Sequence, residues 1–149
     1  MSNNNVTLHR VLTATPEKIY RAFSDPHAFA SWLPPYGFFA IVHQLDFREG
    51  GIYRMSFTNF STGNQHSFGG RYVTLKPNAF LQYTDRFEDP SLPDEMTTTV
   101  RLKEISCGTE LKIVQEGMPS IIPAEMCYLG WQDSLDKLKK LAEPEIPDA

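Results

Sequence analysis

The sequence predicts an α+β fold in which one long C-terminal helix covers a seven-stranded antiparallel sheet. A period-two pattern, interrupted by short turns rich in Gly, Pro, Asn and Ser, runs from residue 38 to residue 115. An apolar stripe with helical spacing follows it. Strands joined by short turns pair antiparallel, and the apolar face of such a sheet needs a cover. Only the last helix is long enough to provide that cover.

The N-terminal segment predicts one strand and two short helices. Residues 6–13 alternate weakly and are rich in β-forming side chains, which favours a first strand. Thr15-Pro16 is typical of a helix start, with Thr as N-cap and Pro at the first helical position, and Asp25-Pro26 repeats this signal. Trp32 lies on the apolar face of the second helix, which Pro34-Pro35 ends.

Six further strands are predicted, each bounded by a turn signal. They cover residues 38–47, 53–58, 68–76, 80–87, 96–105 and 109–115. Gly69-Gly70 marks a bulge or a close approach of another backbone. No repeat or second composition is visible, so we expect a single domain over residues 1–149 with an ordered core from about 5 to 143.

The last helix is predicted from about residue 120 to residue 142. Its apolar stripe consists of Ala124, Tyr128, Trp131, Leu135, Leu138 and Ala142. Gly130 interrupts this helix beside its largest side chain, at a cost of about 1 kcal/mol relative to Ala. A glycine at this place either lets the sheet approach closely or leaves room for something else, and the sequence leaves both interpretations open.

Composition excludes several function classes. The chain has 14 Lys and Arg against 18 Asp and Glu and no basic block, which argues against a nucleic-acid or anionic-membrane surface. No apolar run approaches the roughly 18 residues of a membrane span, and no apolar signal core is visible. Cys107 and Cys127 form no metal or redox spacing, and the four histidines are far apart. We therefore expect a cytoplasmic protein with free thiols, without membrane insertion, metal or cofactor.

Short motifs are spread along nearly the whole chain. They are Thr15-Pro16-Glu17-Lys18-Ile19-Tyr20-Arg21-Ala22-Phe23-Ser24-Asp25-Pro26 with Trp32, Asp46-Phe47-Arg48-Glu49-Gly50-Gly51, Gly70-Arg71-Tyr72, Phe87-Glu88-Asp89, Gly108-Thr109-Glu110-Leu111, and Gly130-Trp131 with Leu135 and Leu138. Their order and spacing resemble the SRPBCC (START/birch-pollen-allergen-like) superfamily. Within it the chain is similar to the family named after the activator of the ATPase of heat-shock protein 90.

The resemblance implies a helix-grip fold, in which a seven-stranded antiparallel sheet wraps around the long C-terminal helix. Two short helices lie between strands 1 and 2 of this fold, and a cavity lies between the sheet and the last helix. The functions that the resemblance implies are broad: lipid and polyketide binding, cyclisation, stress proteins and chaperone co-factors.

Two titratable side chains are candidates for chemistry. Parity places His43 on the face of Ile41 and Leu45, where an imidazole could meet a ligand or transfer protons near neutral pH. A bulge would instead turn His43 to the outer face. Asp85 shares parity with Tyr83, and a carboxylate that faces a cavity has a raised pKa. Its alternative role is to mark the point where the strand leaves the core.

The favoured function is the binding of a small apolar or aromatic ligand between the sheet and the last helix. The expected ligand-binding residues are Trp32, His43, Phe57, Phe68, Tyr83, Asp85, Met118, Met126 and Trp131. For any one apolar member of this set, plain core packing is the alternative. Methionines beside a cavity would repack around varied ligands.

Two other functions stay open. One is a cyclase- or hydrolase-like enzyme with His43 and Asp85 as acid–base groups, although no residue is assigned as catalytic and no nucleophile motif is present. The other is a stress-response chaperone co-factor that works through its surface. The chain lacks the additional N-terminal domain of the eukaryotic activators, which weakens that interpretation. A symmetric homodimer is the default expectation for oligomeric state.

Overall fold

The computed structural model describes residues 5–148, which form seven strands and three helices. In chain order these elements are β1 (Val6–Leu12), α1 (Pro16–Ser24), α2 (Pro26–Trp32), β2 (Phe38–Leu45), β3 (Ile52–Asn59), β4 (Gln65–Lys76), β5 (Phe80–Phe87), β6 (Met96–Ile105), β7 (Gly108–Glu116) and α3 (Ala124–Ala142). The predicted order of elements is confirmed. The last helix begins later than predicted because Pro123 is its N-cap.

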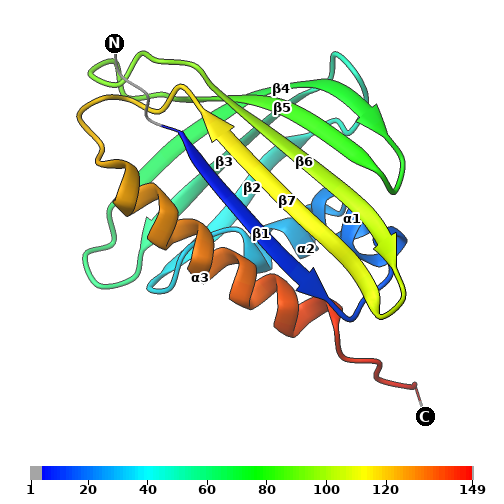
Figure 1. The fold of residues 1–149 in the computed structure, drawn as a ribbon. Coiled ribbons are helices and arrows are strands. Elements are labelled where there is room, and N and C mark those ends of the chain that lie inside the picture. The colour runs from blue at the N-terminus through cyan, green and yellow to red at the C-terminus, as the bar shows by residue number, and fades with distance from the viewer. Residues whose placement is uncertain (1–4, 149) are drawn as a thin grey trace.

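All seven strands belong to one antiparallel sheet in the order β1-β7-β6-β5-β4-β3-β2. Neighbours along the chain pair through short turns, except that β1 joins the far edge beside β7. The sheet curls around α3, which lies along its concave side, while α1 and α2 close one end (Figure 1). The α+β fold that the sequence predicts, with a sheet wrapped around the C-terminal helix, is thus confirmed. Between residues 5 and 148, no helix is long and apolar enough to cross a membrane.

Capping residues set the path of the chain into the concave side. The Thr15 hydroxyl accepts a hydrogen bond from the backbone of Lys18 at 3.2 Å, and Asp25 caps α2 through two backbone N–H groups. The segment after α2 then runs against α3. There Lys137 donates a hydrogen bond to the carbonyl of Pro34 at 2.7 Å, and the Ser134 hydroxyl donates one to the carbonyl of Leu33. These bonds hold the segment at residues 33–36 beside the helix.

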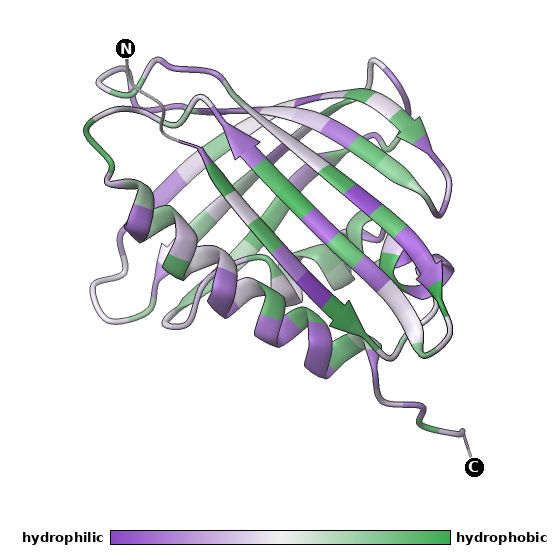
Figure 2. Ribbon diagram, in the orientation of Figure 1, coloured by the Kyte–Doolittle hydropathy of each residue, from purple (hydrophilic) through white to green (hydrophobic). Residues whose placement is uncertain are grey.

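The buried face of α3 differs slightly from the predicted stripe. Trp131, Leu135, Leu138 and Ala142 are buried as expected. Tyr128 is 39% exposed, however, and the smaller side chain of its neighbour Cys127 packs against the core instead. Along the strands, hydrophobic and polar residues alternate, because successive side chains point to opposite faces of the sheet (Figure 2).

The register of β2 changes at one residue. Val42 and Gln44 pair with consecutive residues of β3, so His43 is the extra residue of a β-bulge. Before the bulge, Ile41 lies on the outer face and is 44% exposed. After it, Leu45 packs against the core. The predicted common face for these residues is therefore wrong, because one inserted residue reverses the alternation.

Candidate ligand-binding pocket

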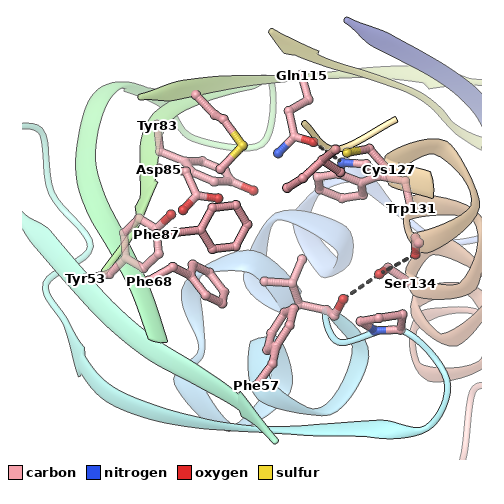
Figure 3. Close-up of a pocket in the computed structure, with 15 residues that line it drawn as sticks. Tyr53, Phe57, Phe68, Tyr83, Asp85, Phe87, Gln115, Cys127, Trp131 and Ser134 are labelled. Atoms are coloured by element: carbon pink, nitrogen blue, oxygen red, sulfur yellow. Dashed lines mark hydrogen bonds between the residues drawn. The ribbon is translucent and has the colours of Figure 1, made fainter. Parts of the chain in front are cut away.

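A pocket of about 190 Å³ lies between the concave face of the sheet and the first turns of α3. Strands β3, β4 and β5 supply most of the strand residues that line it, α3 supplies the facing side, and the segment after α2 also contributes (Figure 3). The lining residues used below are Tyr53, Phe57, Phe68, Tyr83, Asp85, Phe87, Gln115, Cys127, Gly130, Trp131 and Ser134. Aromatic rings dominate this set, as in most small-molecule sites.

The aromatic wall is packed edge to face. The ring centroids of Phe57 and Phe68 are 4.8 Å apart with an interplanar angle of 80°, and those of Tyr53 and Tyr83 are 5.8 Å apart at 89°. Phe87 extends the row, 6.3 Å from Phe68. Such contacts stabilise each pair by about 0.5–1.5 kcal/mol beyond the buried area. The wall is therefore held in place before any ligand arrives.

Gly130 leaves space rather than permitting close packing. Apart from its chain neighbours and the backbone of its own helix, a Cβ atom built on this residue meets no atom of the described chain within 4 Å. By contrast, a Cβ on Gly70 would lie 1.8 Å from the carbonyl oxygen of Thr84. Gly70 thus serves close backbone approach, and Gly130 opens α3 toward the pocket. This decides the question that the sequence left open.

The Trp131 ring is oriented by a buried hydrogen bond. Its indole N–H donates to the side-chain carbonyl of Gln115 on β7 at 3.0 Å. The amide N–H of Gln115 in turn donates to the Thr98 hydroxyl at 3.4 Å. This chain of bonds satisfies the polar atoms at the back of the pocket and keeps an apolar ring face along its side.

Asp85 is the acidic group of the pocket. Its side chain is buried on β5, and its Oδ1 atom has no hydrogen-bond partner among residues 5–148. Burial raises the pKa of Asp85 to about 7, against the lowering effect of hydrogen bonds from Tyr53 and the backbone of Arg86. The predicted inward parity of Asp85 with Tyr83 is confirmed, since both line the pocket.

The structure brings five of the nine predicted site residues to the pocket: Phe57, Phe68, Tyr83, Asp85 and Trp131. The other four predicted residues lie elsewhere, for reasons that differ from one residue to the next.

Trp32 is fully buried against Phe23 and Phe29, and its indole N–H donates to the carbonyl of Ala22 at 2.8 Å. It belongs to the core between α1 and α2, away from the lining of the pocket. Met118 is also buried but does not line the pocket. Met126 is 60% exposed, because the inward face of α3 passes through its neighbour Cys127.

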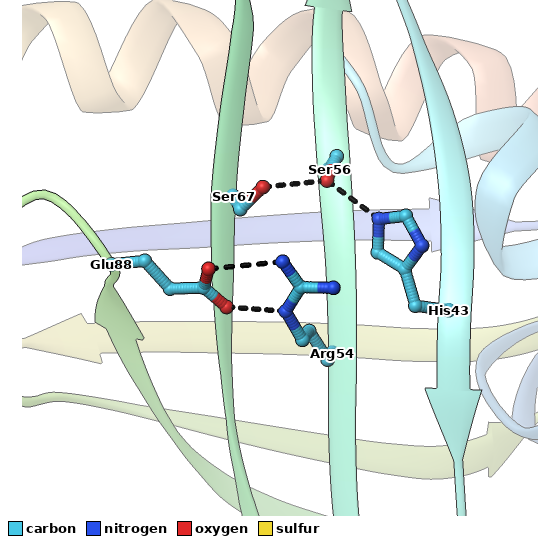
Figure 4. A network of polar contacts seen from close by, with 5 residues as sticks. All are labelled: His43, Arg54, Ser56, Ser67 and Glu88. Carbon is cyan, nitrogen blue, oxygen red and sulfur yellow. Dashed lines mark hydrogen bonds and ion pairs between the residues drawn. The ribbon is translucent and has the colours of Figure 1, made fainter.

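His43 lies on the outer face of the sheet (Figure 4). Its Nε2 atom is 2.7 Å from the Ser56 hydroxyl, which is 2.7 Å from the Ser67 hydroxyl. An ion pair between Arg54 and Glu88 lies beside this network. The prediction that His43 faces the interior is wrong, because His43 continues the outward alternation of Ile41, and only Leu45, beyond the bulge, turns toward the core. His43 and Asp85 are on opposite faces of the sheet.

Several lining residues were not predicted as site residues. Phe87 and Tyr53 share the inward parity of their strands, so the alternation carried a signal for them. Gln115 shares the inward parity of Leu111 and Ile113 on β7, but Gln and Ser are polar residues that mostly face solvent, which hid Gln115 and Ser134 from a hydropathy pattern. Within residues 5–148, no group of three or more His, Cys, Asp or Glu side chains is placed to hold a metal ion.

Known structures share this fold. Protein CV1439 from Chromobacterium violaceum is 55% identical, with a TM-score of 0.94 over 95% of this chain and 99% of that chain. A protein from Rhodobacter sphaeroides is 20% identical, with a TM-score of 0.79 over 92% of this chain and 90% of its own. Protein Ms6760 from Mycobacterium smegmatis is 17% identical, with a TM-score of 0.78 over 96% and 93%. The last two show the fold alone.

No curated protein matches the chain. Residues 13–143 match the family model described as Activator of Hsp90 ATPase homolog 1-like protein. This match spans α1 through α3, including every strand that lines the pocket. The chain therefore belongs to the Activator of Hsp90 ATPase homolog 1-like family, in the SRPBCC superfamily.

Proposed function

We propose that the protein binds a small apolar or aromatic molecule in the pocket between the sheet and α3. The observation that carries this proposal is the open space beside Gly130, which faces a preformed aromatic wall. A glycine inside a helix costs about 1 kcal/mol relative to alanine, a cost that close packing or a functional role can offset. Here close packing is not the reason, which leaves room for a ligand.

The size of the pocket supports a ligand of modest affinity. A molecule that buries about 200–300 Å² of apolar surface gains roughly 5–7 kcal/mol, from which the ordering costs of binding are subtracted. Even before those costs, this gain corresponds to dissociation constants no tighter than about 10 μM, and the costs move them toward the millimolar range. The acid–base interpretation loses its support, since His43 is separated from Asp85 by the sheet.

The test is a titration of the full chain with single-ring apolar molecules, followed by the fluorescence of Trp131. We expect saturable quenching that disappears in Trp131→Phe, because the other tryptophan is buried outside the pocket. Gly130→Leu should abolish binding by filling the space, and Gly130→Ala, the matched control, should retain it. Equal binding by Gly130→Leu and the unchanged chain, or no binding to the unchanged chain, would contradict the proposal.

A further inference from the structure

The pocket contains a buried acceptor atom without a partner among residues 5–148. The Asp85 Oδ1 atom is buried and without a partner, and Figure 3 shows this carboxyl group among the aromatic rings. Buried polar atoms nearly always have a partner, and an unpaired one costs about 1–3 kcal/mol. A molecule that offers a donor to Asp85 removes this cost when it binds.

Three donors of the lining are engaged within the protein. The Tyr53 hydroxyl donates to the carbonyl of Thr84 at 3.2 Å, and the indole of Trp131 donates to Gln115. The Ser134 hydroxyl is shared between two backbone carbonyls. The Asp85 Oδ1 atom, by contrast, is an acceptor without a donor among residues 5–148.

The charge of the lining points the same way. No residue that lines the pocket in the described chain is Lys, Arg or His. The other titratable side chains that face the pocket are Tyr53 on β3, Tyr83 on β5 and Cys127 on α3, and burial raises the pKa of all three. They stay neutral near pH 7, so Asp85 is the group that brings charge to the pocket. A cation compensates that charge, and an anion meets repulsion.

The rings around Asp85 also suit a cation. Tyr53, Tyr83, Phe68 and Phe87 line the pocket with it. Aromatic faces attract an ammonium group by about 0.5–2 kcal/mol. In size, the 190 Å³ of the pocket slightly exceeds the roughly 150 Å³ that accommodates benzene in an engineered cavity. This volume accommodates a molecule with one aromatic ring and a short substituent.

We propose that the ligand of this pocket is a protonated primary amine on a single-ring apolar body, with its ammonium group donating to Asp85. This inference rests on the proposed function. The ring lies against the aromatic wall beside Gly130, and the ammonium group supplies a hydrogen bond to the Oδ1 atom and a positive charge beside the carboxylate.

The test compares four probes of similar shape at pH 7.5 by calorimetry: 2-phenylethylamine, 2-phenylethanol, n-propylbenzene and 3-phenylpropionate. We expect the amine to bind about 10-fold to 100-fold more tightly than the alcohol, as for other charge-assisted bonds, and the acid most weakly. Asp85→Asn should lower the affinity for the amine by a similar factor, and it should change the affinity for n-propylbenzene by less than about threefold. If the variant does not fold, the pH dependence of amine binding to the unchanged chain provides the test. We expect the affinity for the amine to fall from pH 7.5 to pH 5.5 as Asp85 is protonated.

The outcomes separate the two proposals. Binding of n-propylbenzene with no preference for the amine overturns the amine inference and leaves the proposed function intact. An amine affinity that is insensitive to both Asp85→Asn and pH also overturns it. If none of the four probes binds, both proposals are wrong.

Discussion

The indole N–H of Trp131 on α3 donates to the side-chain carbonyl of Gln115 on β7 at 3.0 Å. Both side chains are buried, so this bond joins the helix to the sheet in a place that water does not reach. It also orients the largest ring of the pocket. The stability of the helix on the sheet and the shape of the pocket therefore depend on the same pair.

Gln115→Leu should lower the free energy of unfolding by about 1–3 kcal/mol, because it leaves the buried indole N–H without an acceptor. Urea denaturation measures this loss. The double variant with Trp131→Phe is the control, since it removes both partners. If the two substitutions are additive, the bond contributes nothing specific to stability.

The two tryptophans should respond differently to truncation. Trp32 is fully buried in the core and makes edge contacts with two phenylalanines, so Trp32→Ala should cost about 3–5 kcal/mol. Trp131 borders an existing space, and Trp131→Ala should cost clearly less. Thermal and urea unfolding of both variants gives the comparison. A larger loss for Trp131→Ala would show that its ring is packed on all sides.

Gly130→Ala should stabilise the protein by about 0.5–1 kcal/mol, because alanine favours the helix and its Cβ meets open space. Gly70→Ala is the matched contrast, and it should be strongly destabilising, because its Cβ would clash with the Thr84 carbonyl. Urea midpoints report both effects. Destabilisation by Gly130→Ala would mean that α3 lies closer to the sheet than described.

Asp85 should make stability depend on pH. With a pKa of about 7 in the folded state and 3.8 as its ordinary value, the folded chain holds an extra proton between these limits. The free energy of unfolding therefore falls as pH rises from about 4 to 7, by up to about 4 kcal/mol from this group, and then levels off. Asp85→Asn should remove this fall and be the more stable protein at pH 8.

The difference between Asp85→Asn and the unchanged chain isolates this contribution. Exposed carboxylates act in the opposite direction in both proteins. For example, a hydrogen bond with Arg54 lowers the pKa of Glu88, and one with His9 lowers the pKa of Glu110. Their effects cancel in the difference. Parallel pH profiles for the two proteins would contradict the conclusion that burial raises the pKa of Asp85.

Local pattern was enough to predict much of this protein. The element order, the strands of the sheet, the inward parity of Asp85 and the burial of Trp131 and Leu135 all follow from periodicity within single elements. Backbone geometry sets these periods at two residues for strands and about 3.6 for helices, so they are legible without any knowledge of the neighbouring elements.

The tertiary structure decided the rest. It left His43 on the outer face of β2, buried Trp32 against Phe23 and Phe29 away from the pocket lining, and paired Gln115 with Trp131. It also showed that the space beside Gly130 is open. Each of these depends on the distance and register between elements far apart in the chain. Periodicity within one element carries no information on that relation, so the pocket could be predicted in outline but not residue by residue.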